Sequence, residues 1–173
     1  MTVLDQALRQ LEQLQTFCAL CERLPLPPVT LPPNPVRAAG LDPDIWHGLG
    51  IVGLWAAIDA FAERRQPQDN GSSLINRLSA FLPPELDNSL KELDDMRHLY
   101  AHNFAGIADA TYFKKRTRNF FKSGSSYKLS SGNQFDGHRL ILTLHDFEFY
   151  IDRVREILRY LDRTWPGGRL HLL

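Results

Sequence analysis

The chain has 173 residues, 43% of them hydrophobic, which fits one domain with one core. Its 20 basic and 20 acidic residues give a formal net charge of +0, so overall charge does not indicate a nucleic-acid binder and any such signal must be local. No uncharged run reaches the ~18 apolar residues of a membrane helix, and Asp5, Glu12 and Glu22 interrupt the region where a signal peptide would be apolar. We therefore expect a cytoplasmic protein with no membrane partner.

Leucines at helical spacing predict a first helix from about Thr2 to Arg23. Cys18 and Cys21 lean toward one face of this helix, so we interpret them as core residues. A metal or redox function for this Cys-x-x-Cys is the alternative, but the sequence has no second pair and no strand before it.

Six prolines follow between Pro25 and Pro35. Proline lacks the amide donor and disfavours helix in the residue before it, so residues 25–41 should form a stiff, extended connector. A docking motif for a proline-reading partner is the alternative interpretation.

A second helix begins at Asp42 and Pro43, a capping residue followed by proline, and continues to about Arg65. It is apolar nearly all round, which predicts a place in the centre of a bundle. Asp59 is then conspicuous, because a buried charge needs a partner. It is either a paired structural acid or a residue that orients an arginine or histidine of a site.

Further apolar spacings predict a short helix over Ser73–Phe81 and a third long helix from Glu85 to near Gly106. Thr143 and Asp146 resemble a capping box for a last helix that ends before Pro166. Between these helices, Leu129 and Arg139–Leu144 flank a turn-rich stretch that is compatible with a small β-hairpin. The predicted fold class is all-α, a bundle of four main helices in a single domain over residues 1–173.

The segment from Asp94 to Asn103, on the third long helix, carries the candidate chemistry. Metal-independent RNA cleavage needs a group that takes the proton of the 2'-hydroxyl, a group that protonates the leaving oxygen, and positive charge on the phosphate. Histidine and arginine supply these groups, because imidazole titrates near neutral pH and guanidinium stays charged. Arg97, His98 and His102 are therefore the candidate catalytic residues.

Arg97 and His102 are five residues apart and would point about 140° away from each other on an ideal helix. One ideal helix therefore cannot easily aim both side chains at one phosphate. Either the helix is distorted there, or facing helices of two protomers form a composite site. We favour the second arrangement, which predicts a symmetric homodimer.

A zinc site is an alternative interpretation, because His98 and His102 share a helix face with Asp94 one turn earlier. The segment lacks the glutamate of a zincin helix, and no third ligand is evident. Candidates for a third ligand are His138, His145 and Asp59. We predict no metal and no cofactor.

The segment Arg97-His98-Leu99-Tyr100-Ala101-His102-Asn103 resembles the R-x4-6-H pattern of HEPN domains, in which a polar residue follows the arginine; here that residue is His98. A helical bundle with this pattern in a late helix also matches the family. The apolar, acid-containing stretch from Trp55 to Phe61 is similar to an earlier helix of the family. The resemblance covers about residues 42–106 and, more loosely, the final helix.

This resemblance implies a dimeric, metal-independent endoribonuclease, often a toxin of prokaryotic toxin–antitoxin or phage-defence systems. Arg97 would stabilise the phosphate, His102 would be general acid or base, and His98 would support them. The products would be a 2',3'-cyclic phosphate and a 5'-hydroxyl. Further supporting residues would be Asp59, Tyr100 and Asn103.

An antitoxin protein is a further partner that the resemblance implies. Members paired with a nucleotidyltransferase antitoxin carry a tyrosine two residues after the histidine, and its hydroxyl is the group that is modified. Here that position is Phe104, which puts this particular pairing in doubt.

Residues 109–142 form a basic and aromatic insertion. From Tyr112 to Lys128 it contains cations and aromatic rings but no acid. Cations neutralise phosphates and aromatic rings stack on unpaired bases, so this stretch is a candidate single-stranded RNA surface. The alternative is that the rings pack on the bundle while the lysines face water. The candidate RNA-binding residues are Lys114, Lys115, Arg116, Arg118 and Lys122.

Two competing functions come from other classes. One is a catalytically silent HEPN-like module that binds RNA, a nucleotide or a protein. The other is a structural scaffold, in which Arg97, His98 and His102 form salt bridges with Asp94 and Asp95 on an exposed helix face.

Overall fold

Four long helices account for most of the residues that the structure describes. In a computed structural model they are α1 (Val3–Arg23), α3 (Pro43–Arg65), α5 (Pro84–His102) and α7 (Leu144–Thr164), with the short helix α4 (Leu74–Ser79) before α5. The structure describes residues 1–23, 43–65, 73–102, 127–132, 134–135, 140 and 142–165. This architecture confirms the all-α prediction. None of the described helices is both long and apolar enough to cross a membrane.

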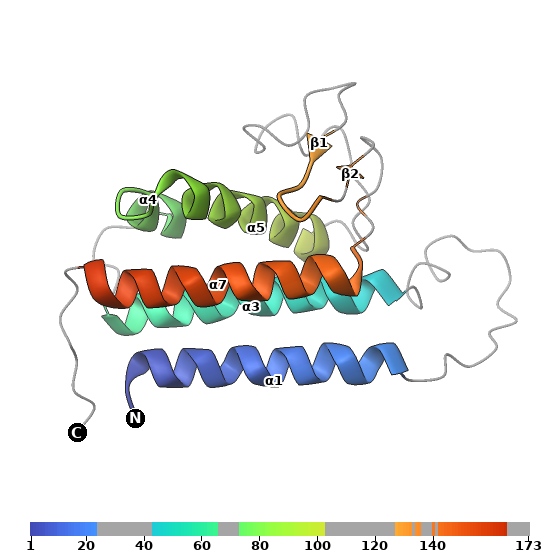
Figure 1. Cartoon of the computed structure of the whole chain (residues 1–173), viewed down its shortest axis with the longest axis horizontal. Coiled ribbons are helices and arrows are strands. Elements are labelled where there is room, and N and C mark those ends of the chain that lie inside the picture. The colour runs from blue at the N-terminus through green and yellow to red at the C-terminus, as the bar shows by residue number, and fades with distance from the viewer. Residues whose placement is uncertain are drawn as a thin grey trace, which may run out of the picture.

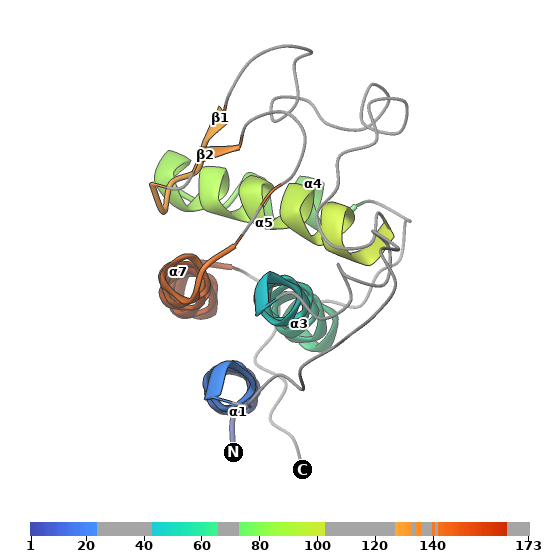
Figure 2. The same cartoon turned by 90° about the vertical axis from the view of Figure 1, so that its right-hand side faces the viewer.

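The helices form three layers (Figures 1 and 2). Helices α3 and α7 lie side by side in the middle layer, α1 covers one side of them, and α5 crosses the other side. As its sequence predicts, α3 is central and packs against α1, α5 and α7. Asp59 on this helix is half-buried instead of fully buried, so the expected buried charge is only partly withdrawn from water.

Glycines on α3 let its neighbours approach closely. A Cβ on Gly48 would lie 1.9 Å from Cδ1 of Tyr100, and a Cβ on Gly50 would lie 2.8 Å from Sγ of Cys18. Cys18 and Cys21 are both buried and carry free thiols, which confirms that they belong to the core.

Polar contacts stabilise both ends of α7: a capping box at its first turn and an arginine of α3 at its last turn. Thr143 and Asp146 form the predicted capping box, in which Asp146 N–H donates to Oγ1 of Thr143 (3.3 Å) and Thr143 N–H donates to Oδ2 of Asp146 (2.8 Å). At the other end the buried guanidinium of Arg65 pairs with the Asp162 carboxylate and donates to the carbonyl oxygen of Asp162 (3.2 Å). A cation at this end also complements the helix dipole.

The predicted hairpin exists, but its second strand was placed wrongly. The strands are β1 (Tyr127–Lys128) and β2 (Gln134–Phe135), which pair antiparallel with Tyr127 opposite Phe135. Leu140, Leu142 and Thr143, the described residues of the predicted Arg139–Leu144 strand that precede α7, are not in a strand, and side chains of the bundle bond the carbonyls of Leu140 and Leu142. Tyr100 Oη donates to Leu140 O (2.8 Å), and Nδ1 of His47 lies 3.0 Å from Leu142 O.

Buried acids attach the hairpin turn to the bundle. Glu92 on α5 accepts the amide N–H of Ser130 (3.3 and 3.2 Å to its two oxygens) and the hydroxyl of Tyr150 (2.7 Å). Asp146 accepts the hydroxyl of Ser131 at 2.5 Å. Because both carboxylates are almost completely buried, these bonds fix the turn over α5 and α7.

Candidate functional site

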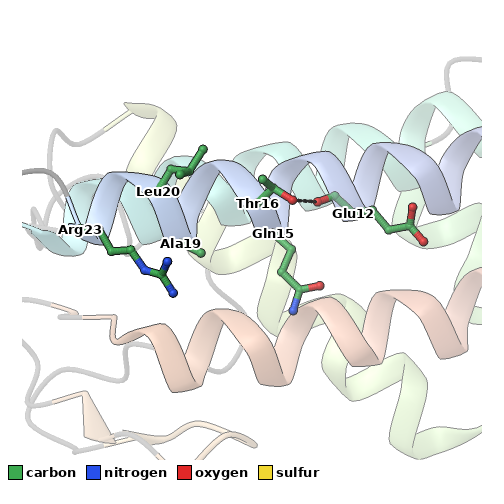
Figure 3. A pocket seen from close by; sticks show the side chains of 6 residues that line it. All are labelled: Glu12, Gln15, Thr16, Ala19, Leu20 and Arg23. Atoms are coloured by element: carbon green, nitrogen blue, oxygen red, sulfur yellow. Dashed lines mark hydrogen bonds between the residues drawn. The ribbon is translucent and has the colours of Figure 1, made fainter.

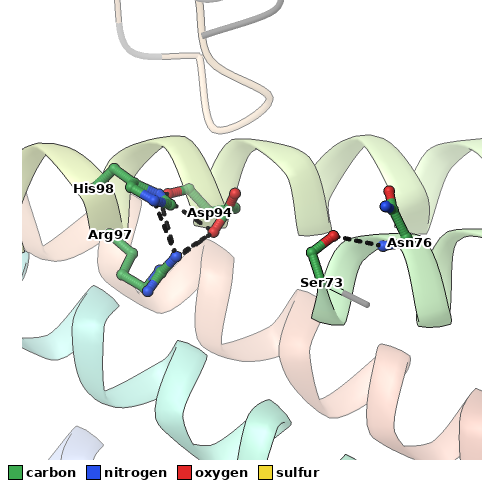
Figure 4. A network of polar contacts seen from close by, with 5 residues as sticks. All are labelled: Ser73, Asn76, Asp94, Arg97 and His98. Atoms are coloured by element: carbon green, nitrogen blue, oxygen red, sulfur yellow. Dashed lines mark hydrogen bonds and ion pairs between the residues drawn. The ribbon is translucent and has the colours of Figure 1, made fainter. Parts of the chain in front are cut away.

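The candidate site lies on α5, on the side chains of Asp94, Arg97 and His98 (Figure 4). Leu90, Leu93 and Met96 of the same helix are fully buried against the bundle. The three polar side chains therefore occupy the remaining faces, and all three are only partly buried. The i, i+3 and i, i+4 spacings bring them together on one helix.

The guanidinium of Arg97 is held from two sides. Its Nε and Nη2 both donate to Oδ1 of Asp94, at 3.2 and 2.7 Å. Its central carbon lies 4.8 Å from the centre of the Trp55 ring on α3, a cation–π contact. The side chain remains 27% exposed, and Nη1 makes no hydrogen bond with any residue that the structure describes. Arg97 is thus oriented in advance and has one edge available.

The imidazole of His98 has a defined tautomer in its neutral form. Its Nδ1 lies 2.7 Å from the backbone oxygen of Asp94, which can only accept, so Nδ1 carries the proton and donates. Nη2 of Arg97 lies 3.3 Å from Nδ1 and 3.2 Å from Nε2. These nearly equal distances place Nη2 beside the ring as a whole instead of in line with one nitrogen lone pair.

The two neighbouring acids have opposite pKa shifts. Burial alone would raise the pKa of Asp94, but hydrogen bonds from His98 and Arg97 outweigh it and hold the pKa below the usual 3.8. Burial, and then the charge of Asp94, raise the pKa of Asp95 to about 7; His98 lowers it by less, and Glu92 adds the smallest contribution, which also raises it. Asp94 is therefore an anion at neutral pH, whereas Asp95 is a carboxyl that exchanges its proton there.

Asp95 is the residue of this cluster that sequence reasoning missed. In the scaffold interpretation Asp95 would form a salt bridge, yet among the described residues it makes no ion pair or hydrogen bond. The signal that could have found it is its position beside Asp94 and three residues after Glu92, since clustered acids on one helix raise one another's pKa.

The structure places the other predicted residues as follows. Tyr100 is buried, and its ring packs on the backbone of Gly48 while its hydroxyl bonds Leu140, so it supports the fold beneath the site. Asp59 makes no ion pair with a described residue. His102 is the last residue of α5, but its side chain lies outside the described part of the chain. The same is true of the whole of Asn103, Lys114, Lys115, Arg116, Arg118 and Lys122.

Within the described residues, no group of three or more histidines, cysteines or acids is arranged to hold a metal ion. The continuous helical path of α5 through His102 also bears on the geometry of the candidate pair. Five residues apart on this helix, Arg97 and His102 start from different faces of it.

Comparison with known proteins adds no relative: no family model, no curated protein and no solved structure matches this chain.

Proposed function

We propose that this chain is a metal-independent endoribonuclease that acts in the cytoplasm as a prokaryotic toxin or phage-defence effector. The observation that carries the proposal is the oriented Arg97 guanidinium, which is stacked on Trp55, anchored by Asp94 and partly open to solvent. A guanidinium held in this way can bind a phosphate with its open edge at little entropic cost.

The proposed reaction needs no group that the chain lacks. A base takes the proton of the 2'-hydroxyl, the oxygen attacks the adjacent phosphorus, and the bond from phosphorus to the 5'-oxygen breaks as an acid protonates that oxygen. The products are a 2',3'-cyclic phosphate and a 5'-hydroxyl. Arg97 would stabilise the charge on the pentacovalent phosphate, and His102 would be the general acid or base.

The three other side chains near Arg97 would have supporting roles. Asp94 would fix the guanidinium, and His98 would stack beside it. Asp95 would be a second proton-exchanging group, because its pKa of about 7 suits acid–base work at neutral pH.

The proposed site is a composite one, shared between the two chains of a homodimer. Arg97 and His102 are five residues apart on α5, which is helical through His102, so they would meet at one phosphate when α5 helices of two protomers face each other. The basic residues Lys114, Lys115, Arg116, Arg118 and Lys122 would hold the RNA beside the site. An antitoxin protein would restrain the activity.

The decisive experiment is incubation of the purified protein with total RNA in EDTA. Wild type should cleave, whereas Arg97→Ala and His102→Ala should each lose about 100-fold or more in rate. Arg159→Ala and His145→Ala, on the exposed face of α7, are matched controls that should cleave normally. Cyclic phosphate ends should appear on the products. Cleavage that persists in both site variants would exclude this mechanism.

A catalytically silent binding module is the second candidate. The specific observation in its favour is that Asp94 already neutralises the charge of Arg97. This function predicts RNA or nucleotide binding that depends on Arg97, with no cleavage in the same assay. Toxicity on expression that His102→Ala abolishes would separate the nuclease from the silent module.

A further inference from the structure

The outer face of α1 exposes apolar side chains that the bundle does not cover. Leu20 is 58% exposed and Phe17 is 46% exposed, and the only ring contact of Phe17 among the described residues is an edge contact with Trp46 at 6.2 Å. In a helix that otherwise buries its apolar side chains, two large exposed ones on the same face indicate a contact surface.

Two shallow hollows run along this face. The first has a volume of about 430 Å³, and the second, of about 340 Å³, shares Glu12, Thr16 and Leu20 with it. All the lining residues of both hollows belong to α1, so another molecule would have to supply the opposite wall. The first hollow is lined by Glu12, Gln15, Thr16, Ala19, Leu20 and Arg23 (Figure 3).

The residues that line the first hollow are complementary to the same residues of a second copy of the chain. If a second α1 runs antiparallel and crosses the first near Phe17, Glu12 of each copy faces Arg23 of the other. The small side chains of Thr16 and Ala19 then lie opposite each other and let the two backbones approach. Neither Glu12 nor Arg23 forms an ion pair with a described residue of its own chain, so both charges are available.

We propose that this face of α1 binds a second copy of the chain in an antiparallel, two-fold symmetric contact. The symmetry repeats every interaction, giving two Glu12–Arg23 pairs around a centre formed by Phe17 and Leu20. The contact is independent of the proposed function, because α1 and α5 lie on opposite sides of the α3–α7 layer (Figure 2). A chain that uses both faces assembles beyond a dimer.

Sedimentation velocity of the full chain over a range of concentrations tests the contact. Leu20→Glu should weaken self-association by about 100-fold, since it places two charges in the apolar centre. Glu12→Arg and Arg23→Glu should each weaken it by about tenfold, because each replaces two attractive pairs with two repulsive ones. Glu148→Arg, an equal charge change on the exposed side of α7, is the matched control and should have no effect.

The double variant Glu12→Arg/Arg23→Glu provides the sharpest result, because it restores opposite charges across the two-fold axis. Self-association should return to within a few-fold of wild type. All four positions are exposed, so circular dichroism should show an unchanged fold. A wild-type chain that is monomeric at ~100 μM, a Leu20→Glu chain that assembles to the same size and as tightly as wild type, or a double variant as weak as the single ones would each overturn the proposal.

Discussion

Asp95 keeps its proton in the folded chain up to about neutral pH, which makes stability depend on pH. Between pH 3.8 and about 7 the unfolded chain has released this proton and the folded chain has not. The stabilisation from this group is therefore fully present below pH 3.8 and is lost as pH rises through 7.

Asp95→Asn should remove this dependence, because the amide resembles the protonated carboxyl. Urea denaturation at pH 8 should show a free energy of unfolding higher than wild type by ~1 to 3 kcal/mol, since each pKa unit corresponds to about 1.4 kcal/mol. At pH 4 the variant and wild type should be nearly equal. Glu148→Gln on exposed α7 is the control for loss of one carboxylate. An identical effect of Asp95→Asn at both pH values would contradict the raised pKa.

Arg97→Lys tests whether the candidate site needs an oriented guanidinium or only a positive charge at this position. Lysine keeps the charge but cannot stack flat on Trp55 while donating two bonds to Asp94. If Arg97 stabilises the phosphate as proposed, the lysine variant should cleave RNA about 100-fold more slowly than wild type. Single-turnover rates with a defined RNA would measure this, and near wild-type cleavage would assign Arg97 a general electrostatic role.

The contact between α3 and α5 depends on the absence of a side chain at Gly48. Replacing an exposed glycine inside a helix with alanine stabilises the folded protein by about 1 kcal/mol. Here the new Cβ would fall 1.9 Å from Cδ1 and 2.4 Å from Cγ of Tyr100, whose hydroxyl is fixed by Leu140. Because the obstructing atoms are near the base of a bonded ring, the ring cannot swing away easily.

Gly48→Ala should therefore lower the free energy of unfolding by about 2 to 4 kcal/mol. Gly53→Ala is the matched control on the same helix, since its Cβ would meet mainly the terminal methyl carbons of Leu14. A flexible leucine end can rotate aside, so this variant should lose far less. Thermal and urea unfolding would measure both, and equal losses would show that the rigidity of Tyr100 is not the cause.

Sequence patterns predicted the helices because the information for them is local. Apolar spacing, the prolines and the Thr143–Asp146 capping box gave bounds for α1, α3 and α7 close to those in the structure. The hairpin strand at Arg139–Leu144 was predicted wrongly because its partners are not local. The carbonyls of Leu140 and Leu142 bond side chains of α5 and α3, which no pattern within the segment indicates.

The candidate site also combines local contacts, which the sequence predicts, with tertiary contacts, which it does not. The contacts of Asp94 with Arg97 and His98 follow from spacing on one helix and were predictable as such. The stacking of Arg97 on Trp55 joins α5 to α3, and the burial of Asp95 depends on the packing around it. Both are tertiary effects, so they emerge only once the helices are placed in space.

For the molecule as a whole, the central question is whether two protomers share each active site. Helix α5 continues through His102, so the proposed nuclease would bring Arg97 of one protomer and His102 of its partner to the same phosphate. This requirement can be tested without a structure of the dimer, because each protomer carries one half of each site.

Mixing Arg97→Ala with His102→Ala should restore cleavage that neither variant has alone. In a mixed dimer one site receives the intact arginine of the His102→Ala chain and the intact histidine of the Arg97→Ala chain, while the other site lacks both. Random exchange makes about half of the dimers mixed, so the mixture should recover roughly a quarter of wild-type activity. Cleavage of a defined RNA after joint refolding would measure this recovery. The same mixing experiment with Leu20→Glu added to both variants is the control that the α1 face is not needed, and it should recover the same activity. A mixture as inactive as its components, with the wild type active, would mean that Arg97 and His102 act within one chain.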